Sequence, residues 1–168
     1  NLSKATTTDY TNLVPDFIVE SMALDVVNSN KEETYVYFEK AAENFGYYLN
    51  HPQVSSPINS LATWSVSRGW EADNPELKVE LEHVTGNGKD TFETIMWNHE
   101  VVKLAVGDSF LEVVRKGNLI VNMIPISPER VKVVFKGARI VRYEIWNGSE
   151  WTKKKVENIL HSQNKRIG

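Results

Sequence analysis

Few side chains in this 168-residue chain combine the types and the spacing that metal or acid–base chemistry needs. The nearest case is the segment HEVVK, which runs from His99 to Lys103. A zinc-protease helix carries a second histidine four residues after the first, so that both imidazoles face one metal ion. Lys103 occupies that position, and an ammonium group cannot ligate a cation. We therefore expect no metal site here and interpret His99 as a partly buried helix residue.

The other histidines and carboxylates predict no catalytic site either. The four histidines are far apart in the sequence: His51, His83, His99 and His161. Asp108 and Glu112 share one face of a predicted strand but lie about 13 Å apart there, which is too far for a general acid/base pair. The chain also lacks the GxxxxGK[ST], GxGxxG and GxSxG motifs. We expect no catalytic, cofactor-binding or metal-binding residues, no cofactor, and no enzyme activity.

Composition excludes several other classes of site. Without cysteine there are no disulfides, zinc–thiolate sites or cysteine nucleophiles. No apolar run approaches the roughly 20 residues of a membrane helix. The net charge of −3 is uneven, because residues 1–50 carry three lysines against eight Asp or Glu. Neither part has the concentrated basic face of a nucleic-acid binder. The lysines at 153–155 predict a solvated surface, and the Trp and Tyr residues do not cluster with Arg or Lys in the sequence, so we expect no base-stacking platform.

Periodic apolar residues predict about three amphipathic helices. The first covers residues 31–49, with Asn30 as its N-cap, and its stripe contains Tyr35, Phe38, Ala42, Phe45 and Leu49. It should end by residues 50–51, because Pro52 disfavours a helical residue before it.

The second and third helices are predicted from their caps. One runs over residues 57–68, with Ser56 as N-cap and Gly69 as its stop, and Trp70 after it is interpreted as a core anchor. The other runs over residues 90–105, with Asp90 at its start and Glu93 as the capping partner, and ends at Gly107. Between them, apolar and charged residues alternate over residues 77–81, which allows one short strand.

Residues 107–146 contain four apolar runs rich in Val, Ile, Phe and Tyr, the residues that suit a pleated, half-buried surface. Turn signals at residues 116–118, 125–128 and 136–137 separate the runs. This pattern predicts an antiparallel β-meander. Residues 147–149 predict one more hairpin turn, and a last apolar run, Ile159 and Leu160, leads to His161.

These elements predict an α+β fold in which an antiparallel β-meander is covered by about three amphipathic helices. We assign residues 31–168 to this domain and residues 1–30 to an extended or mobile N-terminal segment. The chain begins without Met and ends without a closing element, so we expect it to be a piece of a longer protein, truncated at its C-terminus.

Three motifs in this order carry a resemblance to a known family. They are GDSFLE from Gly107, MIPISPERV from Met123, and ILH from Ile159, which is followed by KRIG at residues 165–168. This succession resembles the portal proteins of tailed bacteriophages. The resemblance covers roughly residues 35–168, and it departs from the family pattern at Met123, where Leu is common.

The resemblance implies a structural role. Portal proteins form a ring, usually a dodecamer, at one capsid vertex. The ring is the channel for DNA packaging and ejection, and the head–tail connection. The matched stretch would belong to the α+β wing of the portal, which faces the major capsid or scaffolding protein. Terminase and neck proteins would dock through regions absent here, and DNA would pass the ring with little direct contact. The family is not enzymatic, is not membrane-bound, and assembles in the bacterial host cytoplasm into the virion.

Two other functions remain open from the residues alone. The chain could be a small α+β peptide- or protein-binding module that adds a strand to an exposed sheet edge. An unrecognised hydrolase would rest on His99, Glu100 and Asp108. We also hypothesise that residues 1–30 pack on an adjacent subunit or on capsid protein, where the acidic charge of residues 1–50 could meet a basic surface.

Overall fold

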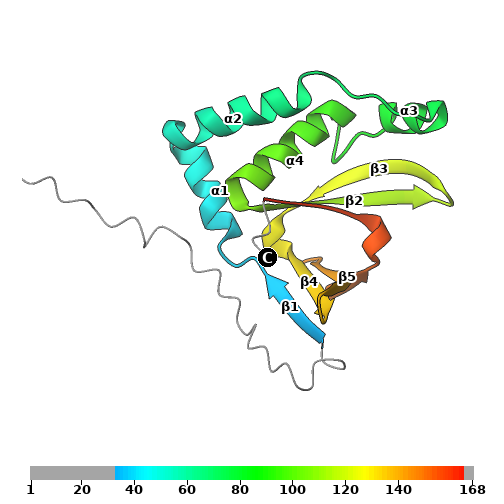
Figure 1. Cartoon of the computed structure of the whole chain (residues 1–168). Helices are drawn as coiled ribbons and strands as arrows, with labels where there is room; N and C mark the ends of the chain where they lie inside the picture. Colours follow the sequence, from blue (N-terminus) through cyan, green and yellow to red (C-terminus); the bar gives the residue numbers. More distant parts are fainter. Residues whose placement is uncertain (1–32, 165–168) are drawn as a thin grey trace, which may run out of the picture.

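Two antiparallel sheets and four helices make up residues 33–164, the part of the chain that the computed structural model describes (Figure 1). The helices are α1 (Ala41–Asn50), α2 (Pro52–Val66), α3 (Pro75–Glu82) and α4 (Phe92–Val106). The strands are β1 (Glu33–Tyr37), β2 (Asp108–Lys116), β3 (Leu119–Ile126), β4 (Val131–Lys136), β5 (Arg139–Trp146), β6 (Trp151–Lys154) and β7 (Ile159–Gln163). The α+β class is confirmed. The predicted segment 1–30 lies outside the described residues.

The predicted meander forms two hairpins that belong to different sheets. One sheet has the order β3-β2-β7 and the other the order β1-β4-β5-β6. Both tight turns are confirmed, and their glycines, Gly117 and Gly137, have φ angles of 64° and 62° that favour glycine. The remaining turn signal, at residues 125–128, does not join paired strands. There Pro128 starts a short 3-10 turn, Pro128–Arg130, which carries the chain from one sheet to the other.

The first half of the predicted helix 31–49 is instead strand β1. Its sequence ETYVY is rich in β-branched and aromatic residues, and it pairs antiparallel with β4, Tyr35 opposite Val134. This partner lies far along the chain, so the local periodicity could not reveal it. The second half is helical as predicted, and α1 ends at Asn50 just before Pro52. Asn30, the predicted N-cap, lies outside the described residues.

Helices α2 and α3 also differ from the prediction. Helix α2 already begins at Pro52, so Pro57 lies inside it rather than at its start. The alternating segment 77–81 is part of helix α3, not a strand. Its cap explains this, because the Asn74 side chain accepts a hydrogen bond from the Glu76 N–H at 2.8 Å and Pro75 occupies the first turn. None of the helices within residues 33–164 is long and apolar enough to cross a membrane.

Helix α4 is confirmed to within about two residues, although its N-cap is Thr91 rather than Asp90. Gly107, with φ 106°, ends the helix and leads directly into β2. The outer edge of the adjoining hairpin is covered by α3 and the loop after it. Glu80 Oε2 accepts a hydrogen bond from Ile120 N, and the Asn122 side chain bonds both backbone groups of Gly86. The first contact occupies a backbone N–H at the edge of β3, and the Asn122 contacts hold the loop against this edge.

Strand β2 separates two apolar cores. Between the helices and the β3-β2-β7 sheet lies a cluster that includes Leu111 and Ile95, with Trp70 packed against it as predicted. Between the two sheets lies a second cluster that includes Phe110 and Tyr143. Figure 1 shows the resulting layers, with the helices above β2 and β3 and the other sheet below them. Neighbouring residues of one strand therefore serve opposite cores.

Phe110→Ala should lower the free energy of unfolding by about 3–5 kcal/mol, because the Phe110 ring is fully buried between the sheets. Leu119→Ala, at a residue that is 55% exposed on the β2–β3 hairpin, should change it by about 0.5 kcal/mol or less. Urea denaturation of the two variants measures this difference. Similar losses in both would contradict the assignment of Phe110 to the core.

Candidate functional site

His99, the candidate in the HEVVK segment, is buried and bonded on both ring nitrogens. Its Nδ1 lies 2.7 Å from Ser109 Oγ and its Nε2 lies 2.8 Å from Ser162 Oγ. Burial, with Lys103 and His161 as lesser causes and Glu100 opposing, lowers the pKa of His99 to about 4. Ser109 and His99 are each only 3% exposed, so a substrate carbonyl cannot reach this serine–histidine pair. The prediction of a partly buried helix residue is confirmed, with burial more complete than expected.

A second hydrogen-bonded chain lies on the opposite face of β2. His161 Nε2 donates to Asp108 Oδ1 at 2.9 Å, and the Tyr143 hydroxyl donates to His161 Nδ1 at 3.1 Å. The His161 ring stacks on Phe110, with 4.3 Å between the ring centroids. Each group comes from a different strand or sheet: Asp108 from β2, His161 from β7 and Tyr143 from β5. The chain therefore joins the two sheets through a polar contact inside an apolar core.

The GDSF and ILH motifs come together at these networks. Strands β2 and β7 pair antiparallel, with Ser109 opposite Ser162 and Phe110 opposite His161. The four histidines share no ligand-like spacing in the sequence, yet the fold brings His99 and His161 to the adjacent residues 109 and 108. That register between distant segments is not visible in the sequence. Within residues 33–164, no three His, Asp or Glu side chains are placed to hold a metal ion.

Glu100 and Glu112, the other acidic candidates, are each paired with a lysine. Glu100 Oε2 lies 2.6 Å from Lys103 Nζ on the surface of α4. Glu112 bonds Lys154 from β6, on the same face of β2 as Asp108. Since Asp108 bonds His161 and Glu112 bonds Lys154, the two carboxylates do not converge, as the strand spacing predicted.

The outer face of the β1-β4-β5-β6 sheet carries a cluster that the sequence did not predict. We call it the aromatic face: Tyr35, Tyr37, Lys132, Trp146 and Trp151. The Lys132 ammonium lies 3.9 Å from the centroid of the Trp151 ring and 5.2 Å from that of Tyr35. Strand pairing places Tyr37 opposite Lys132 and Trp146 opposite Trp151. Aromatic residues that do not cluster with Lys in the sequence thus meet around Lys132, because β1, distant in sequence, joins the sheet of the consecutive strands β4, β5 and β6.

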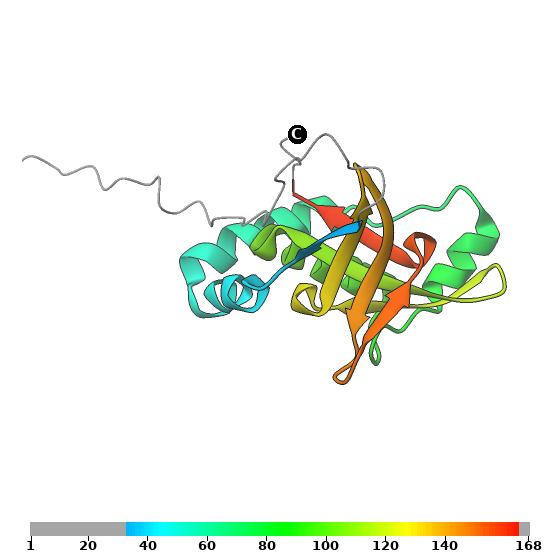
Figure 2. The same ribbon diagram turned by 90° about the horizontal axis from the view of Figure 1, so that it is seen from below.

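Figure 2 shows this sheet from below, with the helices on its far side, so within the described residues no helix covers the aromatic face. Arg142 and two carboxylates beside it form a paired group. Arg142 donates to Glu33 Oε1 at 2.7 Å and to Glu144 Oε1 at 2.9 Å, and both carboxylates raise its pKa. The hydrogen bond from Arg142 in turn lowers the pKa of Glu33. An alternating Tyr-x-Tyr pattern in β1 is the one sequence signal that could have indicated this face.

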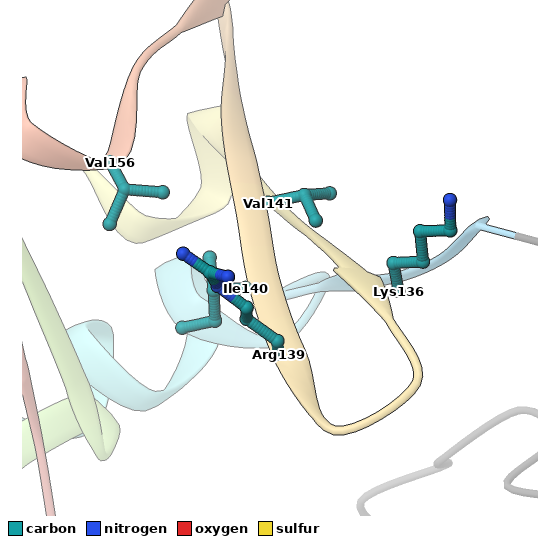
Figure 3. A pocket seen from close by; sticks show the side chains of 5 residues that line it. All are labelled: Lys136, Arg139, Ile140, Val141 and Val156. Carbon is teal, nitrogen blue, oxygen red and sulfur yellow. The ribbon is translucent and has the colours of Figure 1, made fainter. Parts of the chain in front are cut away.

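A shallow hollow of about 290 Å³ lies around β5, where Lys136, Arg139, Ile140, Val141 and Val156 line it (Figure 3). Figure 3 shows Val141 and Lys136 on one side of the strand and Val156 on the other, so the hollow is open rather than enclosed. Its lining is aliphatic and basic and offers no acid–base pair. The aromatic face is the stronger candidate for function, as a surface for a macromolecular partner.

Chains in three solved particle structures have a similar fold. A chain in the neck of the native gene transfer agent (GTA) particle, computed with C12 symmetry, matches with a TM-score of 0.62 and 14% identity over 84% of this chain and 40% of that one. A chain in the neck of the empty GTA particle, computed with C6 symmetry, matches with a TM-score of 0.62 and 14% identity over 79% of this chain and 39% of that one. A chain in the virion of the native particle matches with a TM-score of 0.58 and 14% identity over 76% of this chain and 36% of that one.

This chain therefore spans less than half the length of each of these three chains. No protein-family model matches it, and no curated protein matches it in sequence. At this level of identity the likeness shows a shared fold.

The free energy of unfolding should fall as the pH falls from 6.5 toward 4. Folded His99 stays neutral down to a pKa of about 4, whereas the unfolded imidazole takes up a proton below about 6.5. The group's stability contribution is therefore complete above pH 6.5, and its loss amounts to about 3 kcal/mol by pH 4. Denaturation in urea across this pH range should show a flatter profile for His99→Gln. The exposed-site variant His51→Gln should keep the wild-type profile; equal flattening in both would contradict the assignment.

Asp108→Ala should destabilise the fold by about 1–3 kcal/mol, because it leaves the buried His161 Nε2–H without its acceptor. Asp108→Asn keeps one acceptor oxygen at that position and should lose less. Thermal unfolding of both variants at pH 7 compares them. If both variants lower the stability by the same amount, the result contradicts the view that Asp108 stabilises the fold through its hydrogen bond to His161.

Proposed function

We propose that this chain is a structural subunit of a portal-type ring at a capsid vertex, and that it is not an enzyme. The observation that carries the proposal is the fold it shares, over 84% of its length, with a chain of a particle neck computed with C12 symmetry. A ring of copies at the junction of head and tail would form part of the channel for DNA packaging and ejection. The chain would then be located in the virion.

The internal chemistry of the domain supports a structural role. The two histidines that contact serine or carboxylate groups are held in the interior, and their partners are other side chains of the same fold. They fix the position of β2 against β7 and α4. Two motifs of the portal resemblance, GDSF and ILH, thus have a structural explanation that needs no substrate.

The shared fold covers 40% of the neck chain, so other parts of a portal-type subunit would have to supply the channel wall and the docking site for a terminase. The domain described here would correspond to the wing. Its partners would be neighbouring copies in the ring and the major capsid or scaffolding protein around it. Assembly would take place in the cytoplasm of a bacterial host.

The full-length product of the gene that encodes this chain should assemble into closed rings of about twelve subunits, as the C12 symmetry of the neck suggests. Negative-stain electron microscopy shows the rings directly, and mass photometry gives the subunit number. A monomer that binds an extended peptide at the outer edge of β1 would instead favour the alternative, a peptide- or protein-binding module.

A further inference from the structure

Helix α2 has an exposed apolar stripe. Its fifteen residues, Pro52–Val66, include no Asp, Glu, Lys or Arg. Val54, Pro57, Leu61 and Trp64 recur at spacings of three and four and so share one face; we call them the α2 stripe. Trp64 is 74% exposed and Leu61 46%. A solvated helix face normally carries charged residues, whereas the centre of a protein interface is depleted in charge and enriched in Trp.

The opposite face of α2 is the one that packs inside the subunit. Ala62 is fully buried there, the helix contacts α1 and α4, and Trp97 Nε1 donates to Thr63 Oγ1 at 3.2 Å. The α2 stripe can therefore change without loss of these contacts. Within residues 33–164 nothing covers it.

We propose that the α2 stripe of one subunit packs on the aromatic face of the next copy in the ring. The inference rests on the proposed function and names the two surfaces through which neighbouring subunits of the ring would make contact. Two surfaces that differ and lie apart on one subunit are what a head-to-tail contact requires, and such a contact closes into a ring when its rotation is a fraction of a full turn. Contact of the stripe with its own copy would give a dimer and leave the aromatic face bare.

The position of the two surfaces fits this arrangement. Figure 1 shows α2 in the uppermost helical layer, and Figure 2, seen from below, shows the β1-β4-β5-β6 sheet in front of the helices. The stripe and the aromatic face thus lie on opposite sides of the subunit. A neighbour can engage each of them without blocking the other.

The chemistry of the surfaces also matches. The aromatic face offers Tyr35, 64% exposed, together with Tyr and Trp rings that are frequent at the energetic centre of interfaces. Lys132 lies over the Trp151 ring, and Arg142 bonds Glu33 and Glu144. A helix without charged residues can therefore cover the rings around Lys132 and leave this cation its contact with Trp151.

Engineered cysteines can test the contact, since this chain has no cysteine of its own. In the full-length product, with any cysteine outside this chain replaced, the double variant Leu61→Cys/Tyr35→Cys places one thiol on each surface. After treatment with a short bis-maleimide, a denaturing gel should show a ladder of covalent oligomers that extends to the ring number. Each single variant should remain a monomer. The matched double variant Leu61→Cys/Leu119→Cys, with the second thiol on the exposed β2–β3 hairpin, should give no ladder.

A substitution provides a second readout. Trp64→Glu should reduce the fraction of subunits in rings at least tenfold at a fixed concentration, because it places a charge in the centre of the contact. Leu119→Glu should leave ring formation unchanged. Circular dichroism should show the same fold in both variants, because both residues are exposed.

The outcomes separate the two proposals. Rings that form without the Leu61–Tyr35 ladder, or with an equal ladder from the Leu61–Leu119 pair, overturn this inference while the ring function stands. Covalent dimers from Leu61→Cys alone also overturn it, because they indicate contact of the stripe with itself. If the unaltered full-length product forms no rings, the proposed function fails and this inference fails with it.

Discussion

The two-residue alternation of β2 is the constraint on which the rest of this structure depends. Phe110 points into the core between the sheets and Leu111 into the core beneath the helices, and each is 1% exposed. Because both faces of the strand are buried, a shift of one residue would exchange every side chain between the two cores. Strand β2 carries apolar residues on both of its faces. The helices therefore pack on one face of the β3-β2-β7 sheet, and the β1-β4-β5-β6 sheet packs on its other face.

Polar contacts select one register for β2. Asp108 and Ser109 follow one another on β2 and reach opposite faces, where Asp108 meets His161 and Ser109 meets His99. A slip of the strand would separate Asp108 from His161 and Ser109 from His99, and a buried polar group without its partner costs about 1–3 kcal/mol. Apolar packing alone would tolerate several registers of Val, Leu and Phe. The histidines therefore act here as determinants of register, and burial keeps His99 neutral for that purpose.

The sequence predicts those features that local chemistry decides. The hairpins at Gly117 and Gly137, the helix that Gly107 ends and the early stop of α1 before Pro52 all follow from single residues or short periods. Strand β1 was missed because its partner β4 is distant in sequence, and α3 was missed because its Asn74 cap outweighs an apparent alternation. The two histidine networks could not be found in the sequence for the same reason as β1, because they exist only after non-local strands have paired. The aromatic face is partly local, since β4, β5 and β6 are consecutive, but the two tyrosines of β1 reach it only through the pairing of β1 with β4.

The same distinction explains why the ionisable side chains that could carry chemistry face the interior of this domain, whereas its unusual exposed residues are apolar or aromatic. A catalytic site needs ionisable groups that a substrate can reach, whereas here His99 and His161 serve the interior. The residues that remain exposed and unusual are apolar or aromatic: the α2 stripe on one side and the aromatic face on the other. A monomeric domain would gain solubility from charges at Leu61, Trp64 or Tyr35. Their apolar character is explained if other subunits cover these surfaces, and two different covered surfaces per subunit suit the head-to-tail ring that we propose better than a symmetric pair.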